Sequence, residues 1–263
     1  MAHTPRILEE IVAHKRREVA AARERYPLSR LERQAAKAPP PRDFAGALAR
    51  PDLSLIAEIK RRSPSAGLIR ANFRPSRIAR TYERHGAAAI SVLTDRRYFG
   101  GSLAILRHVR RATSLPVLRK DFIIDPYQVV EARAGGADAV LLIAEALRVE
   151  ELARLRELAE GLGLAALVEA HGLGALRKAL EAGARIVGIN NRNLRTFRTD
   201  LATTRRLIRH VPPGRLVVSE SAIRTRADVE RLASWRVDAI LVGEALMQRP
   251  RVGRAVDELL GRA

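Results

Sequence analysis

Eight short apolar runs, each followed by an amphipathic segment, predict an α/β fold: a (β/α)8 TIM barrel with an N-terminal helical extension. The repeat begins at Leu53 and continues to Leu260, a length that suits eight strand–helix units. Its apolar runs are continuous, as in parallel sheets that helices cover. A doubly wound open sheet is the alternative, but no Gly-x-Gly-x-x-Gly motif follows the first run.

Two helices are expected before the repeat. Apolar residues at helical spacing predict a helix over 7–25, and a second is expected over 29–36 with Ser29 as its N-cap. A run of prolines then ends the second helix. We expect one domain over residues 1–263, in which residues 1–48 form an extension packed on the barrel.

The repeating region divides into eight strand–helix pairs, and glycine or proline stands at many of the junctions. The predicted strands lie within the apolar runs 53–60, 87–95, 116–122, 137–144, 165–171, 186–193, 215–221 and 239–246. The predicted helices are 75–84, 102–112, 125–135, 149–162, 174–182, 200–209, 226–234 and 252–260.

The composition is that of a folded protein with a sizeable core, since 47% of the residues are hydrophobic and 29% are charged. The absence of cysteine excludes a disulfide framework and a thiolate metal site. No apolar run reaches the length of a membrane span, and the first residues lead into a charged helix rather than a signal peptide. We therefore expect a cytoplasmic protein.

The formal net charge of +19 makes a basic nucleic-acid-binding protein the rival from another functional class. The positive residues are, however, spread along the chain, mostly as arginine mixed with glutamate on predicted helices. Aromatic residues make up only 4%, so platforms for stacking on bases are scarce. The charge is better interpreted as an arginine-rich surface that also steers anionic substrates.

Charged and amide side chains close most of the predicted strands. In this fold the C-terminal ends of the strands surround one opening, where active sites are built. Any single residue of this kind is compatible with an ordinary ion pair at the rim, but at least five strands contribute one. Two lysines and three carboxylates at one opening can shift each other's pKa values and share acid–base work. The charged and amide residues of this set are Glu58, Lys60, Lys120, Glu169, Asn190, Arg192 and Glu220, and beside them in the sequence stand Phe122, Ser221, Gly243 and Glu244.

No metal site is predicted. His171 lies near a strand end, but no second ligand stands at a metal-binding spacing, and other histidines, such as His108, are on predicted helices. Gly243 opens a short helix after the last strand and is either a phosphate seat built from backbone N–H groups or a tight turn.

Five segments near the strand ends carry a more specific pattern. They are Glu58-Ile59-Lys60-Arg61-Arg62-Ser63-Pro64-Ser65, Ser91-Val92-Leu93-Thr94-Asp95, Leu118-Arg119-Lys120-Asp121-Phe122, Gly188-Ile189-Asn190-Asn191-Arg192 and Ser219-Glu220-Ser221. Together they resemble the indole-3-glycerol phosphate synthase family, and the likeness covers the whole chain. The resemblance implies a barrel with an N-terminal helical extension and no cofactor. It also implies conversion of 1-(2-carboxyphenylamino)-1-deoxyribulose 5-phosphate to indole-3-glycerol phosphate, with release of carbon dioxide and water, in tryptophan biosynthesis.

The resemblance assigns catalytic roles. Lys120 is the general acid that polarises the substrate carbonyl, and we expect nearby cations and apolar cover to lower its pKa. Glu169 and Lys60 are the acid–base groups for the loss of water, with the division between them left open. Glu58 orients Lys60, and Asn190 hydrogen-bonds the reacting region.

The resemblance also assigns substrate contacts. Phe122 is expected to pack on the anthranilate ring, whose carboxylate meets a cation such as Lys60. The phosphate is expected at Ser63 and at the backbone around Gly243 and Glu244. Three further residues complete the expected site: Arg192, which ties Asn190 to Glu58, and Glu220 and Ser221 in the polar wall.

Two positions depart from the family pattern. Ala222 stands where the family usually continues Glu-Ser-Gly, and Ala66 stands where many relatives have a lysine. If position 222 needs a positive φ, alanine costs roughly 1 kcal/mol there. Both departures predict a looser grip on the phosphate. The loop over 61–72 is a lid candidate because it combines Gly67 with several charges.

Another phosphosugar-binding barrel is the nearest alternative. A phosphoribosylanthranilate isomerase would be expected to use a cysteine–aspartate pair, and this chain lacks cysteine. Chemistry of the tryptophan synthase α type would not explain Lys60 together with Lys120. As partners we expect a phosphorylated small-molecule substrate, no nucleic acid and no membrane, for a monomer or weak homodimer.

Overall fold

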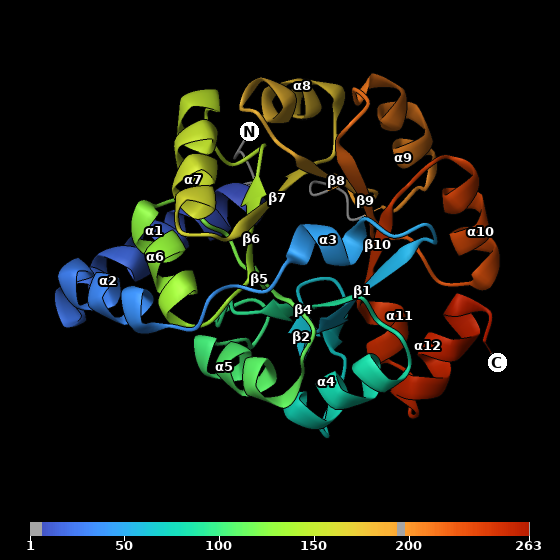
Figure 1. Cartoon of the computed structure of the whole chain (residues 1–263), viewed down its shortest axis with the longest axis horizontal. Helices are drawn as coiled ribbons and strands as arrows, with labels where there is room; N and C mark the ends of the chain where they lie inside the picture. Colours follow the sequence, from blue (N-terminus) through green and yellow to red (C-terminus); the bar gives the residue numbers. More distant parts are fainter. Residues whose placement is uncertain (1–6, 194–197, 263) are drawn as a thin grey trace, which may run out of the picture.

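The computed structural model describes residues 7–193 and 198–262, in which eight parallel strands close into a barrel (Figure 1). The strands are hydrogen-bonded in the order β1-β10-β9-β8-β7-β6-β5-β4, with β4 returning to β1. The predicted (β/α)8 fold is therefore confirmed. The barrel strands are β1 (Ser54–Ile59), β4 (Ala89–Leu93), β5 (Val117–Lys120), β6 (Ala139–Ile143), β7 (Ala165–Ala170), β8 (Ile186–Asn190), β9 (Leu216–Glu220) and β10 (Ala239–Val242).

A ring of helices surrounds these strands. Several helices begin where the sequence supplies a cap: the side chain of Ser102 accepts a hydrogen bond from the Ile105 N–H, and Asp125 caps a helix that has Pro126 in its first turn. The helices of the ring are α4 (Pro75–Arg84), α5 (Leu103–Ala112), α6 (Pro126–Ala134), α7 (Val149–Gly161), α8 (Leu173–Glu181), α9 (Ala202–Leu207), α10 (Arg226–Ser234) and α12 (Val252–Leu260).

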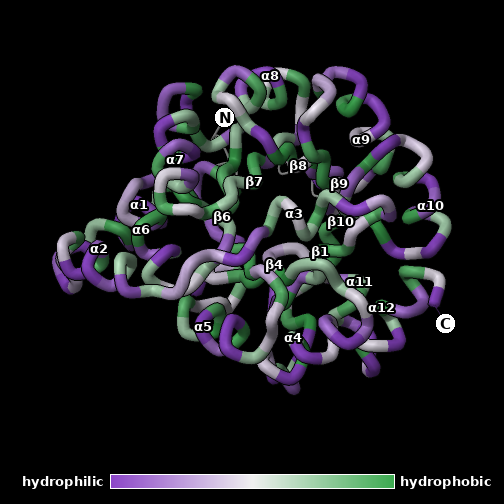
Figure 2. The backbone as a smooth tube through the Cα atoms, viewed as in Figure 1, coloured by the Kyte–Doolittle hydropathy of each residue, from purple (hydrophilic) through white to green (hydrophobic). Residues whose placement is uncertain are grey.

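Side chains alternate across each strand, and this alternation places the polar residues at the barrel mouth. On β1, Leu55 and Ala57 pack outward against helices, whereas Ile56 packs inside the barrel. Glu58 is two residues beyond Ile56 and shares its inward face. The same relation holds for Leu118 and Lys120, Leu167 and Glu169, and Val218 and Glu220. Figure 2 shows the hydrophobic positions gathered along the strands, with hydrophilic positions on the outer helices.

A short helix, α3 (Phe44–Leu48), closes the other end of the barrel and was not expected from the sequence. Phe44 and Leu48 are buried and belong to the same apolar cluster as Ile56 and Leu118. Asp43 caps the helix by accepting a hydrogen bond of 2.7 Å from the Gly46 N–H. A helix of this length carries too few turns for periodicity to reveal it.

Two further local expectations need correction, and a third is confirmed. The second helix is α2 (Leu28–Lys37); its N-cap is Pro27, and no side chain caps it, so the expected cap at Ser29 is wrong. The helix expected over 200–209 is α9 followed by the 3-10 turn η1 (Ile208–His210). The last apolar run ends its strand, β10, at Val242, and Gly243 opens a separate short helix, α11 (Glu244–Met247), as expected.

The loop after β1 contains a small antiparallel hairpin that the sequence analysis did not anticipate. Its strands are β2 (Arg62–Ser63) and β3 (Gly67–Leu68), and Gly67 has a φ of +63°, a conformation that glycine adopts without strain. Arg70 donates hydrogen bonds from its guanidinium to the carbonyl oxygens of Met247, Arg249 and Pro250. The loop is therefore tied to the segment that follows α11.

The N-terminal helices lie along one side of the barrel. In Figure 1, α2 projects beside α6, and α1 (Ile7–Arg25) runs behind them. The Tyr127 hydroxyl on α6 lies 3.2 Å from the Ala22 carbonyl oxygen and 3.0 Å from that of Tyr26. Of the helices in the described part of the chain, none combines the length and the apolar character needed to span a membrane.

Candidate active site

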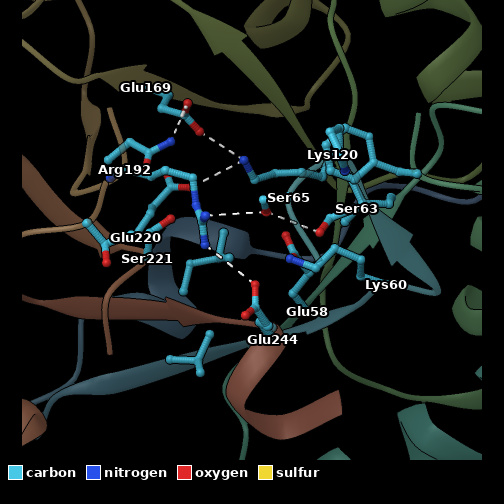
Figure 3. Close-up of a pocket in the computed structure, with 18 of the residues that line it drawn as sticks. Glu58, Lys60, Ser63, Ser65, Lys120, Glu169, Arg192, Glu220, Ser221 and Glu244 are labelled. Atoms are coloured by element: carbon cyan, nitrogen blue, oxygen red, sulfur yellow. Dashed lines mark hydrogen bonds and ion pairs between the residues drawn. The ribbon is translucent and has the colours of Figure 1, made fainter. Parts of the chain in front are cut away.

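A cavity of about 520 Å³ opens at the C-terminal ends of the barrel strands (Figure 3). It is lined by all the side chains that the sequence analysis named as catalytic or substrate-binding, although they come from strands and loops far apart in the chain. These residues are Glu58, Lys60, Ser63, Lys120, Phe122, Glu169, Asn190, Arg192, Glu220, Ser221, Ala222, Gly243 and Glu244.

Lys120 is the centre of the polar side of this cavity. Its Nζ lies 2.8 Å from Glu169 Oε2 and 3.3 Å from Glu220 Oε2. Asn190 Nδ2 donates to the other oxygen of Glu169, Oε1, at 2.9 Å. Strands β5, β7, β8 and β9 thus each contribute one member of a continuous network, which holds the ammonium at a defined place in the barrel mouth.

The charge state of Lys120 corrects one expectation. Burial alone would lower the pKa of Lys120, but the carboxylates of Glu169, Glu220 and Glu58 outweigh it and raise the pKa above the usual value of a lysine. The expected lowering is therefore wrong for the structure without substrate. Its physical reason is that the close neighbours of Nζ are anions and not cations.

Glu169 and Glu220 hold their protons with different strengths. Burial, together with the charge of Glu169, raises the pKa of Glu220 to about 8. Burial also acts on Glu169, but Lys120 and hydrogen bonds from Asn190 and Glu220 outweigh it, so the pKa of Glu169 is lowered. A protonated carboxyl, a carboxylate and an ammonium therefore stand together at neutral pH, a set that can give and take protons.

Two glycines make room for these carboxylates. A Cβ at position 188 would lie 2.4 Å from Glu220 Oε1, and one at position 243 would lie 2.3 Å from Glu58 Oε1. Gly243 has a negative φ, so close approach to Glu58, and not a left-handed turn, is what requires glycine there.

Glu58 and Lys60 form a second ion pair on the β1 side of the cavity. Lys60 Nζ lies 2.7 Å from Glu58 Oε1, and Glu58 is buried. The expected orientation of Lys60 by Glu58 is thus consistent with the geometry. The cavity presents two ammonium groups, on β5 and just beyond β1, each held by carboxylates.

Arg192 has a different neighbour from the one expected. Its backbone N–H donates to Asn190 Oδ1 at 2.9 Å, which supports the expected link to Asn190. The guanidinium, however, lies against Glu244 Oε2 at 3.5 Å and Ser65 Oγ at 3.3 Å, as Figure 3 shows. It therefore joins the loop after β1 to the segment after β10.

The turn after β9 is strained at the position where the chain departs from the family pattern. Ser221 and Ala222 both have a φ of +65°, in the left-handed region that favours glycine. Position 222 therefore has the positive φ at which alanine is expected to cost roughly 1 kcal/mol. Across the cavity, Ser63 Oγ accepts a hydrogen bond of 3.1 Å from the Ala66 N–H.

On the apolar side of the cavity, Phe122 was expected from the sequence and its other members were not. Ile7, Leu8 and Ile11 of α1 line it, together with Phe99, whose ring lies 6.1 Å from that of Phe122. The helical spacing of the α1 residues indicated an apolar face, but nothing local to the sequence indicated that this face covers the barrel mouth.

His171 contacts the end of β8 and the loop after β6. Its Nδ1 lies 2.7 Å from the Asn190 carbonyl oxygen, and its backbone N–H donates to Glu145 Oε1 at 2.8 Å. Within residues 7–193 and 198–262, no three histidine, aspartate or glutamate side chains are grouped so as to hold a metal ion.

The chain is similar to known proteins over nearly its full length. The family model described as indole-3-glycerol phosphate synthase matches residues 8–259. A protein of that name from Roseiflexus castenholzii is 52% identical over 265 residues, covering 97% of this chain and 98% of the relative. Another from Dechloromonas aromatica is 51% identical over 257 residues, covering 96% and 98%.

Solved structures of low identity share the barrel alone. Thiamine phosphate pyrophosphorylase from Pyrococcus furiosus superposes with a TM-score of 0.61 at 22% identity, over 80% of this chain and 94% of that one. The tryptophan synthase complex of the same organism gives 0.58 at 18% identity, over 80% and 98%. The family model and the relatives that are about half identical in sequence identify the family as well as the fold: this chain belongs to the indole-3-glycerol phosphate synthase family.

Proposed function

We propose that this chain converts 1-(2-carboxyphenylamino)-1-deoxyribulose 5-phosphate to indole-3-glycerol phosphate by ring closure, decarboxylation and dehydration, in tryptophan biosynthesis. The observation that carries the proposal is the arrangement of Lys120, Glu169 and Glu220 opposite Lys60 and Glu58 in one cavity. Family membership supports the choice of substrate among the phosphosugars that barrels of this kind bind.

Ring closure requires a proton donor at the substrate carbonyl. As the aromatic carbon attacks the carbonyl carbon, the carbonyl oxygen gains negative charge and takes a proton from the Lys120 ammonium to become a hydroxyl. The raised pKa of Lys120 means that this proton is present at neutral pH. Insertion of the substrate oxygen between Lys120 and Glu169 would weaken their ion pair and make the proton easier to give.

Decarboxylation and dehydration then restore the aromatic system. The bond to the carboxylate carbon breaks, carbon dioxide leaves, and its electron pair remains in the ring. The new hydroxyl departs as water after accepting a proton, while a second proton is lost from the substrate. Glu169 and Lys60 are the acid and base for this step, and Glu220, which holds a proton close to Glu169, is suited to replenish it.

The remaining polar residues hold these groups in place. Glu58 orients Lys60, and Asn190 orients Glu169 while remaining within reach of the reacting region. Ser221 completes the polar wall. Arg192 ties the loops on either side of the phosphate end through Glu244 and Ser65.

The substrate is expected to lie across the cavity. Its anthranilate ring packs on Phe122, with its carboxylate towards Lys60. Its phosphate meets Ser63 and the backbone at Ala222, Gly243 and Glu244. The apolar lining on one side and the polar lining on the other match the two ends of this molecule.

The direct test is to mix purified protein with the carboxyphenylamino substrate and to record the fluorescence of the indole product. Formation of product at a rate proportional to enzyme concentration is the expected result. No product with this substrate, from a protein whose melting curve shows it to be folded, would reject the proposal in favour of another phosphosugar-binding barrel.

A further inference from the structure

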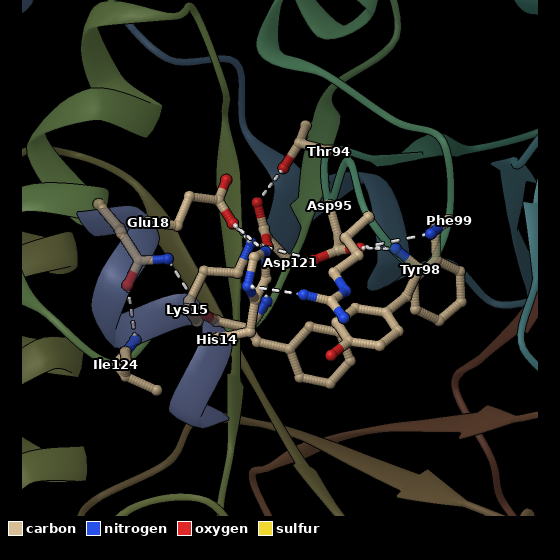
Figure 4. Close-up of polar contacts among 12 residues, drawn as sticks. His14, Lys15, Glu18, Thr94, Asp95, Tyr98, Phe99, Asp121 and Ile124 are labelled. Carbon is tan, nitrogen blue, oxygen red and sulfur yellow. Dashed lines mark hydrogen bonds and ion pairs between the residues drawn. The ribbon is translucent and has the colours of Figure 1, made fainter. Parts of the chain in front are cut away.

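Lys15, on α1, is a buried cation enclosed by carboxylates (Figure 4). Its Nζ lies 2.9 Å from Asp121 Oδ1, 3.0 Å from Asp95 Oδ2 and 2.9 Å from Glu18 Oε2. The side chains of Lys15 and Asp121 are 2% exposed and that of Asp95 is 0% exposed. Such a buried charge is costly unless several partners surround it, and here the partners come from α1 itself and from the ends of β4 and β5.

Each of the two aspartates also holds the backbone of an aromatic residue. Asp95 Oδ1 accepts hydrogen bonds from the N–H groups of Tyr98, at 2.7 Å, and Phe99, at 3.3 Å. Asp121 Oδ1 accepts from the Phe122 N–H at 2.8 Å. Lys15 therefore joins the two carboxylates that fix Phe99 and Phe122, the neighbouring rings of the cavity wall.

The same helix supplies the rest of that wall. Ile7 and Ile11 line the cavity, and they lie eight and four residues before Lys15, on one face of α1. The Lys15 ammonium thus anchors this face of α1 over the aromatic side of the barrel mouth. Burial by itself would lower the pKa of Lys15, but Asp121, Asp95 and Glu18 outweigh it and raise the pKa, so the anchor is charged at neutral pH.

We propose that Lys15 is a positioning residue for the aromatic end of the substrate. It sets the distance between α1, Phe99 and Phe122, and so the width of the slot for a planar ring. The inference rests on the proposed function, because that function supplies the ring.

The barrel side of the cluster has additional support. Arg119 lies 3.2 Å from Asp121 Oδ2, and Thr94 donates to the same oxygen at 2.5 Å. Loss of Lys15 therefore leaves Asp121, and with it the neighbouring Lys120, anchored to β4 and β5. Loss of Lys15 removes the ion pairs that join α1 to Asp95 and Asp121. Affinity for the aromatic ring of the substrate should therefore fall more than the rate of proton transfer.

Four variants test this role, one of which, Lys15→Arg, keeps the positive charge. Lys15→Met removes the anchor but leaves excess buried negative charge. Lys15→Met combined with Asp95→Asn removes one cation and one anion, and the asparagine Oδ1 can still accept from Tyr98 and Phe99. Asp95→Asn alone keeps Lys15 and weakens the tie. Melting curves establish which variants are folded.

The measurements distinguish binding of the aromatic ring from binding of the phosphate. We expect the double variant to raise KM about tenfold, equivalent to about 1.4 kcal/mol, while kcat changes less than about threefold. The inhibition constant of indole-3-glycerol phosphate, which carries a ring, should rise by a similar factor. That of inorganic phosphate, which has no ring, should be unchanged. Asp95→Asn should give an intermediate KM, and Lys15→Arg should recover part of the loss.

Arg156→Met is the matched control. Arg156, on α7, is partly buried, donates to the Ala182 carbonyl oxygen at 2.7 Å and pairs with Glu160 at 2.6 Å, so its loss destabilises the protein near the opposite end of the barrel. It should leave KM unchanged. Folded Lys15 and Asp95 variants with wild-type affinity for indole-3-glycerol phosphate would overturn the positioning role. Failure of the wild-type protein to form product would instead reject the proposed function.

Discussion

Lys120, Glu169 and Glu220 show how the partners of a side chain decide its chemistry. A lysine is usually exposed at a protein surface, but Lys120 at the end of β5 is enclosed by glutamates from β7 and β9. Its Nζ lies 2.8 Å from Glu169 Oε2 and 3.3 Å from Glu220 Oε2. The ammonium therefore keeps its proton until a substrate atom replaces one of these partners.

Lys120→Ala should lower kcat by about two to four orders of magnitude, the range typical of a general acid, because no other ammonium occupies its place between Glu169 and Glu220 in the described part of the chain. Steady-state fluorescence of the indole product measures this. Wild-type-like turnover in folded Lys120→Ala would remove the assignment of Lys120 as general acid.

Glu220→Gln should change how stability depends on pH. The folded-state pKa of Glu220 is about 8, above the ordinary 4.5, so the folded state holds a proton that the unfolded state has released between these values. This group's stabilising contribution is complete below about pH 4.5 and is lost as the pH rises towards 8. Glutamine resembles the protonated acid and does not titrate.

The free energy of unfolding of Glu220→Gln, relative to wild type, should therefore increase from pH 5 to pH 8. Urea melts at several pH values measure it. Glu230→Gln, at an exposed carboxylate of α10, controls for the loss of one acidic side chain. A difference between Glu220→Gln and wild type that is constant with pH would contradict the shifted pKa.

Ala222→Gly should relieve the left-handed backbone after β9. The change is expected to stabilise the protein by up to about 1 kcal/mol and to lower KM, since the turn at the proposed phosphate end then forms without strain. Arg236→Gly, at another residue with positive φ (+62°) outside the cavity lining, should gain stability without a change in KM. An unchanged KM in Ala222→Gly would argue against a looser phosphate grip.

At the scale of elements, Arg70 holds the loop between β1 and α4, in addition to the contact of Ser65 with Arg192. Arg70 donates hydrogen bonds to the carbonyl oxygen of Met247, at the end of α11, and to two carbonyl oxygens after it. The hairpin of β2 and β3 lies just before Arg70. The loop also carries Ser63 and Ser65, so its position affects the expected phosphate site. Arg70 was not singled out in the sequence, because its acceptors are about 180 residues away.

Arg70→Gln should loosen this loop. Hydrogen exchange of backbone amides in residues 62–70 is expected to speed up about tenfold, because the charged hydrogen bonds that oppose local opening are lost. Arg74→Gln, whose guanidinium bonds to Asn72 within the loop, is the control and should leave exchange nearly unchanged. Equal exchange rates in Arg70→Gln and wild type would show that the tie does not restrain the loop.

At the scale of the whole molecule, ion pairs with carboxylates neutralise only part of the positive charge, which leaves a net charge of +19. Many arginines pair with glutamates on the same helix, such as Arg254 with Glu258 and Arg226 with Glu230. Such exposed pairs contribute little to stability, but they reduce the local field. The uncompensated remainder is expected to raise the association rate of an anionic substrate.

Duplex DNA should therefore bind weakly and without specificity. We expect retention in a filter-binding assay at low salt that disappears by about 0.15 M salt, where nonspecific contacts to phosphates are screened. Product formation should be unaffected by DNA at this salt concentration. Tight retention under these conditions would revive the nucleic-acid-binding alternative.

The sequence by itself determined the barrel and the polar character of its mouth. Continuous apolar runs mark the strands, and the period of two puts Glu58, Lys120 and Glu169 beyond inward-facing core residues. Both signals are local, since they depend on residues a few positions apart. At position 222 the family resemblance indicated only a departure from the usual glycine, and the structure supplied the positive φ.

Only the tertiary structure decided which groups meet. The direction of the Lys120 pKa shift depends on carboxylates from other strands, and the cover that α1 places over the mouth depends on Lys15 reaching Asp95 and Asp121. These interactions join segments about 50 to 100 residues apart in the chain. Electrostatic interactions and burial depend on which groups are close in space. The sequence pattern therefore identifies the residues of the site but not which of them interact.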